Sequence, residues 1–355
     1  MRFISLAFPL AALIAGIAAR AEARPRPAHV NSQAQALPSS IQAVRIVLPP
    51  RLMAAHPATL AVFGPQGKLA PDVPVDLSDG ERVTTDRTGR AHFTAPATTT
   101  FLLARAEDAT AAALIDPATG ASEVKAVSLL PVVSLHENVW LCGPGLQGDA
   151  RADNVTINGH AALVLAASPE CMVVLPPPVT TPGAASISVS APGVHWAAAT
   201  TLVSLDFESP RRALQPDQKG RLTIRVHGSA AKLNLVAENT SPDVLRFIRG
   251  DVQQVRTSGG ANNSAWIEVQ AIRSGDFSFR ARIISAPSPA IAARYLLAAA
   301  PYGGRSVRRN LEKLARRLAH HPHKIDSERR KLVRILNRAA PGDFRTLLSA
   351  AYSAL

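Results

Sequence analysis

The sequence predicts a mainly β protein, built from tandem β-sandwiches and followed by a small α-helical bundle. Three observations predict this class. Short alternations of apolar and polar residues recur between residues 41 and 285, separated by turn residues. Glycine and proline are frequent, with 21 and 28 of 355 residues, which favours a chain rich in turns. After residue 288 the apolar spacing changes from two residues to the three or four of an α-helix.

The N-terminal segment indicates export. Arg2 precedes an apolar run, Phe3–Ala19, and small residues follow at Ala21 and Ala23. A charged start, a short apolar core and a small-residue cleavage site are typical of a secretory signal peptide. We therefore expect residues 1–23 to be removed, with an uncleaved anchor as the alternative, and residues 24–40 to form a Pro-, Ala- and Gln-rich linker. No later segment has enough consecutive apolar residues to predict a transmembrane helix.

A first β domain is expected over residues 41–130. Its most regular part reads VPVDLSDG from Val73, then TTDRTGRAHF from Thr84. This order of strand, turn and strand resembles the central hairpins of bacterial Ig-like domains. The acidic residues within it are interpreted as turn and cap residues, because the ligand spacing of a calcium loop is absent; they are Asp76, Asp79 and Asp86.

Residues 131–205 contain the most informative pattern. Three strands are expected at Asn154–Ile157, Ala161–Ala166 and Ser186–Ser190, and Asn158-Gly159 between the first two is a strong hairpin signal. A Gly-Pro-Gly segment precedes them, and Ser-Pro and Pro-Gly turns follow. This order resembles the IPT/TIG immunoglobulin-like domain of exported bacterial proteins. The resemblance implies a β-sandwich that serves as a spacer or binding unit and carries no reaction chemistry.

The chain has only two cysteines, Cys142 and Cys171, and both lie in this second domain. An exported chain meets oxidising conditions, so we expect a disulfide between them. Two buried thiols or a metal pair are the alternatives, and the metal pair lacks flanking His or Cys ligands at a suitable spacing. A disulfide closing a loop of about 30 residues would stabilise the fold by about 3 kcal/mol.

A third β-sandwich is expected over residues 206–285. Leu222, Ile224 and Val226 alternate with polar residues, which indicates a strand with one buried and one wet face. Turns are expected near residues 258–263 and 274–276. Trp266 is interpreted as a core residue, and a binding edge that it would form with Arg246 and Arg249 is the alternative.

Residues 286–355 are expected to form a basic helical domain. Ser288-Pro289 is typical of a helix start, and Val307, Leu311, Leu314 and Leu318 fall on one helix face. Asp326 and Asp343 are expected to cap two later helices.

The positive charge of the chain is concentrated in this domain. The net charge is +13, and residues 301–355 hold 13 Lys and Arg against 4 Asp and Glu, an excess of nine. The outward cations, candidates for binding a polyanion, are Arg308, Arg309, Arg316, Arg317, Arg329, Arg330, Lys331, Arg334 and Arg338.

Nothing in the sequence predicts an enzyme. The chain contains no Gly-x-Ser-x-Gly elbow, phosphate loop or His-Glu-x-x-His motif, and we expect no cofactor. The cluster His320-His321-Pro322-His323 carries ligands that zinc or copper prefers, but the proline breaks a helix there. We interpret the cluster as a loop between helices rather than a metal site.

Two binding hypotheses remain for a secreted, periplasmic or cell-surface bacterial protein. In the first, the Ig-like domains hold the molecule extended and bind a protein or glycan of the envelope through loops and strand edges. In the second, the basic domain docks on the envelope surface or an acidic polysaccharide. The alternative to this second hypothesis is that the basic helix face is only solvated and binds no partner. Nucleic acid is not expected as a partner, because aromatic residues that would stack on bases are sparse in this domain.

Overall fold

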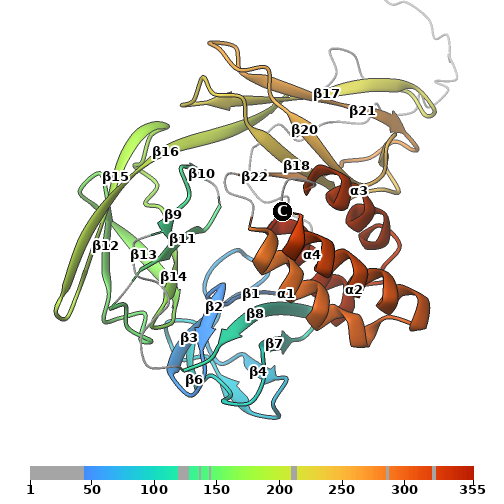
Figure 1. Ribbon diagram of the computed structural model, residues 1–355. Coiled ribbons are helices and arrows are strands. Elements are labelled where there is room, and N and C mark those ends of the chain that lie inside the picture. The colour runs from blue at the N-terminus through green and yellow to red at the C-terminus, as the bar shows by residue number, and fades with distance from the viewer. Residues whose placement is uncertain are drawn as a thin grey trace, which may run out of the picture.

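The computed structural model describes residues 44–118, 128–135, 137–143, 145–208, 214–284, 288–321 and 325–355. The predicted signal peptide, residues 1–23, and the predicted linker, residues 24–40, lie outside these ranges. Three β units and one helical unit are arranged as a closed ring (Figure 1). The predicted class, mainly β with tandem sandwiches followed by a C-terminal helical bundle, is confirmed. Within the described ranges, no helix combines the length and apolar character needed to cross a membrane.

The first sandwich packs a five-stranded sheet, in the order β2-β8-β7-β4-β5, against β1, β3 and β6. Its strands are β1 (Arg45–Val47), β2 (Arg51–Met53), β3 (Pro57–Phe63), β4 (Pro74–Leu77), β5 (Arg82–Thr84), β6 (Arg90–Thr94), β7 (Phe101–Ala106) and β8 (Ala109–Asp116). The carboxylate of Asp86 accepts hydrogen bonds from the backbone N–H groups of Thr88 and Arg90. Asp79 accepts one from the N–H of Glu81, so both act as turn residues, as predicted.

The second sandwich contains the predicted hairpin. Its strands are β9 (Ser128–Leu129), β10 (Val132–Ser134), β11 (Val139–Cys142), β12 (Asn154–Ile157), β13 (His160–Ala167), β14 (Cys171–Leu175), β15 (Gly183–Ala191) and the first part of β16 (Val194–Glu208). Asn158 and Gly159 both have positive φ, 51° and 80°, as a tight hairpin turn between β12 and β13 requires. Val155, Ile157 and Val189 point into its core.

Strand β16 connects the second and third sandwiches without a linker. Its first part pairs with β15, from Val194 to Leu202, and its second part pairs with β17, from Ser204 to Glu208. The expected domain boundary between residues 205 and 206 therefore falls inside a continuous strand. A shared strand fixes the direction of both sheets, because the backbone hydrogen bonds run on across the junction.

The third sandwich pairs β16, β17 (Lys219–His227), β21 (Ser264–Ala271) and β19 (Leu245–Phe247) in one sheet. The facing sheet holds β20 (Val252–Arg256), β18 (Asn234–Asn239) and β22 (Phe279–Ile284). Leu222, Ile224 and Val226 are buried, as their alternation predicts. The prediction of a core Trp266 is wrong, because its neighbours Ala265 and Ile267 are the buried residues of β21, and strand alternation turns the indole outward.

The helical unit consists of α1 (Pro289–Ala299), the short 3-10 helix η1 (Ala300–Tyr302), α2 (Arg305–His320), α3 (Ile325–Leu336) and α4 (Asp343–Ser353). Ser288 precedes α1 and Pro289 is its first residue, as predicted. The expected caps are wrong. Asp326 lies inside the first turn of α3, and Asp343 is the first residue of α4, after a Gly342 that makes no side-chain cap.

The helical unit fills the space between the first and third sandwiches (Figure 1). One core cluster joins its leucines to Leu103 and Leu114 of the first sandwich and to Val236 and Ile284 of the third. The structure is therefore not the extended string of modules that the first binding hypothesis assumed. Burial of apolar surface at both ends of the bundle holds the ring closed.

Candidate polyanion-binding face

Helix α2 separates its apolar and basic residues onto opposite sides. Leu311, Leu314 and Leu318 are buried in the core that the bundle shares with the sandwiches. At 3.6 residues per turn, four exposed cations of α2 lie within an arc of roughly 80° on the solvent side of the helix. They are Arg305, Arg309, Lys313 and Arg316. Arg305 and Lys313 were missed among the predicted site residues, although the same helical spacing would have identified them.

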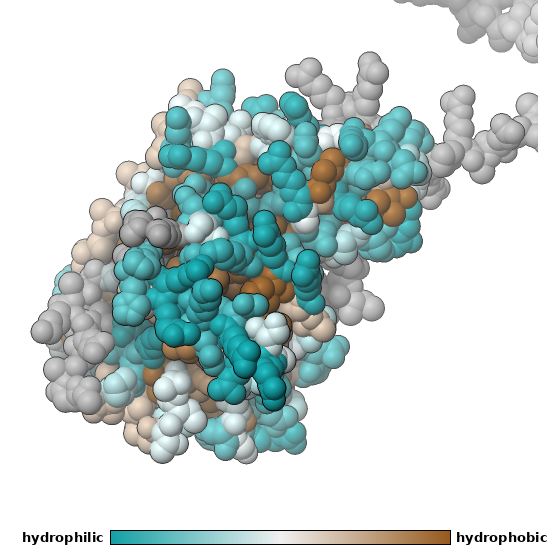
Figure 2. All heavy atoms as spheres, turned by 45° about the vertical axis from the view of Figure 1, so that its right-hand side comes forward, coloured by the Kyte–Doolittle hydropathy of each residue, from teal (hydrophilic) through white to brown (hydrophobic). Residues whose placement is uncertain are grey.

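Helix α3 and the turn after it add further exposed cations. Arg330 and Arg334 are exposed on α3, and Arg338 is exposed in the turn after it. Arg317 of α2 lies 3.6 Å from the buried carboxylate of Glu328 in α3, which joins the two helices. Figure 2 shows hydrophilic side chains gathered over this side of the molecule.

One predicted outward cation is in fact buried. Arg329 is 4% exposed, because its position on α3 faces strand β20 of the third sandwich. Its Nη1 donates to Gln254 Oε1 at 3.1 Å and lies 3.2 Å from Asp326 Oδ1. Burial lowers the pKa of the Arg329 guanidinium, and this effect outweighs the nearby Tyr352 and Asp326, which would raise it. Arg329 therefore anchors α3 to the sandwich and is removed from the candidate site.

Three other predicted cations are engaged in ion pairs. Arg308 pairs with Glu312 one helical turn later, at 2.9 Å. Arg317 and Lys331 share Glu328, and the Lys331 pair is the shorter at 2.6 Å.

Seven exposed cations in the described part of α2, α3 and the following turn make no ion pair. We call this set the basic face: Arg305, Arg309, Lys313, Arg316, Arg330, Arg334 and Arg338. Like charges gathered on one surface raise the local potential and attract an anionic partner.

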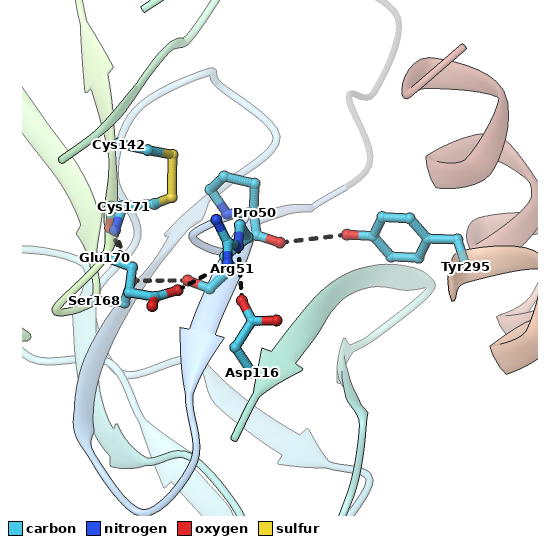
Figure 3. Close-up of a disulfide and its surroundings, with 8 residues drawn as sticks. All are labelled: Pro50, Arg51, Asp116, Cys142, Ser168, Glu170, Cys171 and Tyr295. Carbon is cyan, nitrogen blue, oxygen red and sulfur yellow. Dashed lines mark hydrogen bonds and ion pairs between the residues drawn. A yellow bond between two sulfur atoms is a disulfide. The ribbon is translucent and has the colours of Figure 1, made fainter. Parts of the chain in front are cut away.

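The predicted disulfide is present. Cys142 of β11 and Cys171 of β14 are directly paired across their antiparallel strands, with Cα atoms 4.1 Å apart. Figure 3 shows that the bond lies beside a junction of three units. Ser168, which precedes β14, donates from its hydroxyl to the backbone oxygen of Arg51 at 2.7 Å. The disulfide therefore stiffens a turn that contacts the first sandwich.

The junction is held by charges (Figure 3). Arg51 lies 2.7 Å from Asp116 and 3.4 Å from Glu170 of the second sandwich. Arg294 of α1 approaches the other oxygen of Asp116 at 2.5 Å. Burial alone would raise the pKa of Asp116, but the hydrogen bonds from Arg51 and Arg294 outweigh it and hold this pKa below its usual value. The charges of Arg51, Asp116 and Arg294 therefore pair with one another and join the units.

No cluster of three potential metal ligands occurs among the described residues. His320 ends α2 and His321 follows it. Pro322 and His323 lie outside the described residues.

Comparisons with known proteins give structural likenesses alone. No protein-family model matches the chain, and no curated protein matches it. Similar solved structures include the extracellular region of plexin A4, with 10% identity, a TM-score of 0.26, and coverage of 66% of this chain and 22% of that one. The N-terminal four Ig domains of Dscam1 have 11% identity, a TM-score of 0.21, and coverage of 65% and 72%.

A third similar structure is the Bacteroides ovatus protein SGBP-B of a mixed-linkage glucan utilization locus, in complex with a heptasaccharide. It has 11% identity, a TM-score of 0.19, and coverage of 66% of this chain and 60% of that one. Strand pairing within this chain defines its three sandwiches. The IPT/TIG and bacterial Ig-like resemblances stay predictions.

Proposed function

We propose that this chain is an exported, non-enzymatic, modular binding protein that docks on a polyanion through the basic face. The observation that carries the proposal is that the seven exposed cations of this face make no ion pair in the described structure. A cation already paired within the protein gains little from a new anion, whereas an unpaired one contributes its full screened attraction.

The scaffold supports this function because it presents the face rigidly. The bundle shares one core with the first and third sandwiches, so the helices that carry the cations are fixed on both sides. Binding then orders the long side chains but not the backbone, which reduces the entropic cost of association. In this proposal the sandwiches are the spacer units that the IPT/TIG resemblance implies.

Export is supported by two features of the chain. The predicted signal peptide directs it out of the cytoplasm, and the Cys142–Cys171 disulfide suits an oxidising compartment. The proposed partner is therefore a component of the envelope or the exterior.

The test compares two charge reversals in the mature full-length protein. In the first variant, Arg309, Arg316 and Arg334 of the basic face are replaced by Glu. In the matched control, Lys68, Arg87 and Lys232, which are exposed and make no ion pair, are replaced by Glu. Both variants change the net charge equally.

Binding to immobilised heparin is measured at several salt concentrations. We expect wild type and control to bind with an affinity that falls steeply between low and physiological salt, and the basic-face variant to lose binding. An equal loss of heparin binding in the two variants would show that binding depends on net charge alone, and would overturn the proposal. Circular dichroism checks that the bundle remains folded.

A further inference from the structure

The outer face of the third sandwich carries an exposed indole. Trp266 is 48% exposed on β21, and the guanidinium carbon of Arg221 on β17 lies 4.3 Å from the centroid of its ring. A cation above an aromatic face is a favourable arrangement that holds the indole in one position. The ring is therefore orientated before any partner arrives.

The strand register places chemically complementary side chains around the indole. Thr223 is directly opposite Trp266, and Glu268 is directly opposite Arg221. Ile248, 38% exposed, donates its N–H to the backbone oxygen of Glu268 and so continues the sheet. An apolar centre surrounded by long polar side chains is the composition of a binding patch rather than of an ordinary wet sheet face.

The charge of this patch is positive. Within β17, β19 and β21 the exposed cations without an ion pair are Lys219, Arg221 and Arg246, and the one acidic side chain is Glu268. In the adjoining turns, Asp217 precedes β17, and Arg249 and Asp251 follow β19. Elsewhere on the sheet the charges are balanced, because Arg225 pairs with Glu208 at 2.6 Å and His227 lies 2.8 Å from Asp206. The partner that fits the unbalanced part is an anion.

The loop after β19 is the part of this sheet that approaches the bundle. Gly250, which follows Arg249, packs so closely on Asn337 after α3 that an added Cβ would lie 3.0 Å from the Asn337 amide nitrogen. Asn337 precedes Arg338, a member of the basic face. Trp266 itself lies on the side of the third sandwich that faces away from the bundle, because the sheet of β18, β20 and β22 is the one that packs against the helices.

We infer that the partner is an acidic polysaccharide, and that Trp266 and its surrounding arginines form a second subsite for it. A sugar ring stacks on the indole, and carboxylates of successive sugars pair with Arg221 and Arg246. This inference rests on the proposed function and names its class of partner.

A polysaccharide fits better than a nucleic acid or a lipid surface. Single-stranded nucleic acids bind to series of aromatic side chains. Among the described residues of the bundle, the only exposed tyrosine or phenylalanine is Tyr302, because Tyr295 and Tyr352 are buried and Phe344 is half-buried. A lipid surface needs a protruding apolar edge, whereas Trp266 lies in the middle of a sheet face beneath Arg221.

The experiment titrates the mature full-length protein with a hexamer of galacturonate. We compare Trp266→Ala, Trp266→Phe and Trp140→Ala, the last being a matched control, because Trp140 is 45% exposed on the second sandwich. We expect Trp266→Ala to weaken binding on the order of tenfold, Trp266→Phe to retain most of it, and Trp140→Ala to leave it unchanged. Because Trp266 is exposed, its replacement preserves the core.

Other outcomes separate this inference from the proposed function. If heparin binding is salt-dependent and requires the basic face, but Trp266→Ala leaves hexamer binding unchanged, the second subsite is refuted and the proposed function stands. If no variant changes heparin binding, the proposed function fails first. Binding of single-stranded DNA or anionic vesicles that depends on Trp266, without binding of the hexamer, would overturn the polysaccharide assignment.

Discussion

Arg105 of β7 and Asp343 of α4 form a two-bond ion pair although 238 positions of sequence separate them, with Nε–Oδ1 at 2.9 Å and Nη2–Oδ2 at 2.5 Å. Bidentate geometry of this kind is the strongest form of a side-chain ion pair. The pair connects the first sandwich to the last helix, and so helps to close the ring.

We expect Arg105→Ala to lower the free energy of unfolding by about 1 kcal/mol, because both partners are partly exposed and solvent screens the attraction. Chemical denaturation measures the loss. The control is Arg82→Ala, which removes a similar two-bond pair with Asp76 that is exposed and lies within one sandwich. An equal effect in the two variants would show that ring closure adds nothing.

The disulfide supplies a second prediction. Replacing both Cys142 and Cys171 by Ala should lower the free energy of unfolding by about 2–4 kcal/mol, because it releases a loop constraint on the unfolded chain. The helical circular dichroism band should remain. Thiol counting on the unreduced, unfolded wild type should find no free thiol, and two free thiols would refute the pairing.

Glu137, in the loop between β10 and β11, predicts a dependence of stability on pH. Burial raises the pKa of this carboxyl from 4.5 to about 7, although the positive charge of Arg282 on β22 acts to lower it. Between these two values the folded protein holds a proton that the unfolded chain has released. The free energy of unfolding should therefore fall as the pH rises through this window, by about 3 kcal/mol for this group.

Glu137→Gln should remove that part of the decline. Asp153, whose pKa burial raises to about 6, acts in the same direction and is unchanged in both proteins. The difference between wild type and variant therefore isolates Glu137. Thermal unfolding from pH 4 to 8 measures it, and parallel curves for the two proteins would contradict the prediction.

Adjacent arginines on α3 should behave differently. Arg329→Ala should lower the free energy of unfolding by about 1–3 kcal/mol, because it removes the bond to Gln254 and a buried packing contact. Arg330→Ala should change it by less than about 0.5 kcal/mol, because Arg330 is exposed and makes no ion pair. A similar loss of stability for both would show that Arg329 is not an anchor.

Local patterns in the sequence predicted local structure well. The alternation of Leu222, Ile224 and Val226 placed a strand and its buried face, and Asn158-Gly159 placed a hairpin, because side-chain period and φ preference act within a few residues. The outward position of Trp266 was available from the same alternation. The core position expected for Trp266 is wrong because strand parity decides which way the side chain points.

Contacts over long distances were not predictable in this way. Asp343 has the residue type of a cap, but it is the first residue of α4 and its carboxylate bonds to Arg105 instead. Arg329 and Arg330 are the same residue type one position apart, and only the placement of β20 against α3 decides which is buried. An ion pair or a buried cation depends on what packs against a helix, and the sequence of the helix does not contain that information.

The sequence by itself determined the strands, the turns, the apolar stripe of α2, the disulfide and the concentration of positive charge near the C-terminus. Only the tertiary structure decided that the modules close into a ring, which cations stay unpaired, and that the guanidinium of Arg221 lies over the exposed indole of Trp266. The physical reason is range. Propensity and periodicity act between neighbours in the chain, whereas shared cores and ion pairs form between residues that folding brings together.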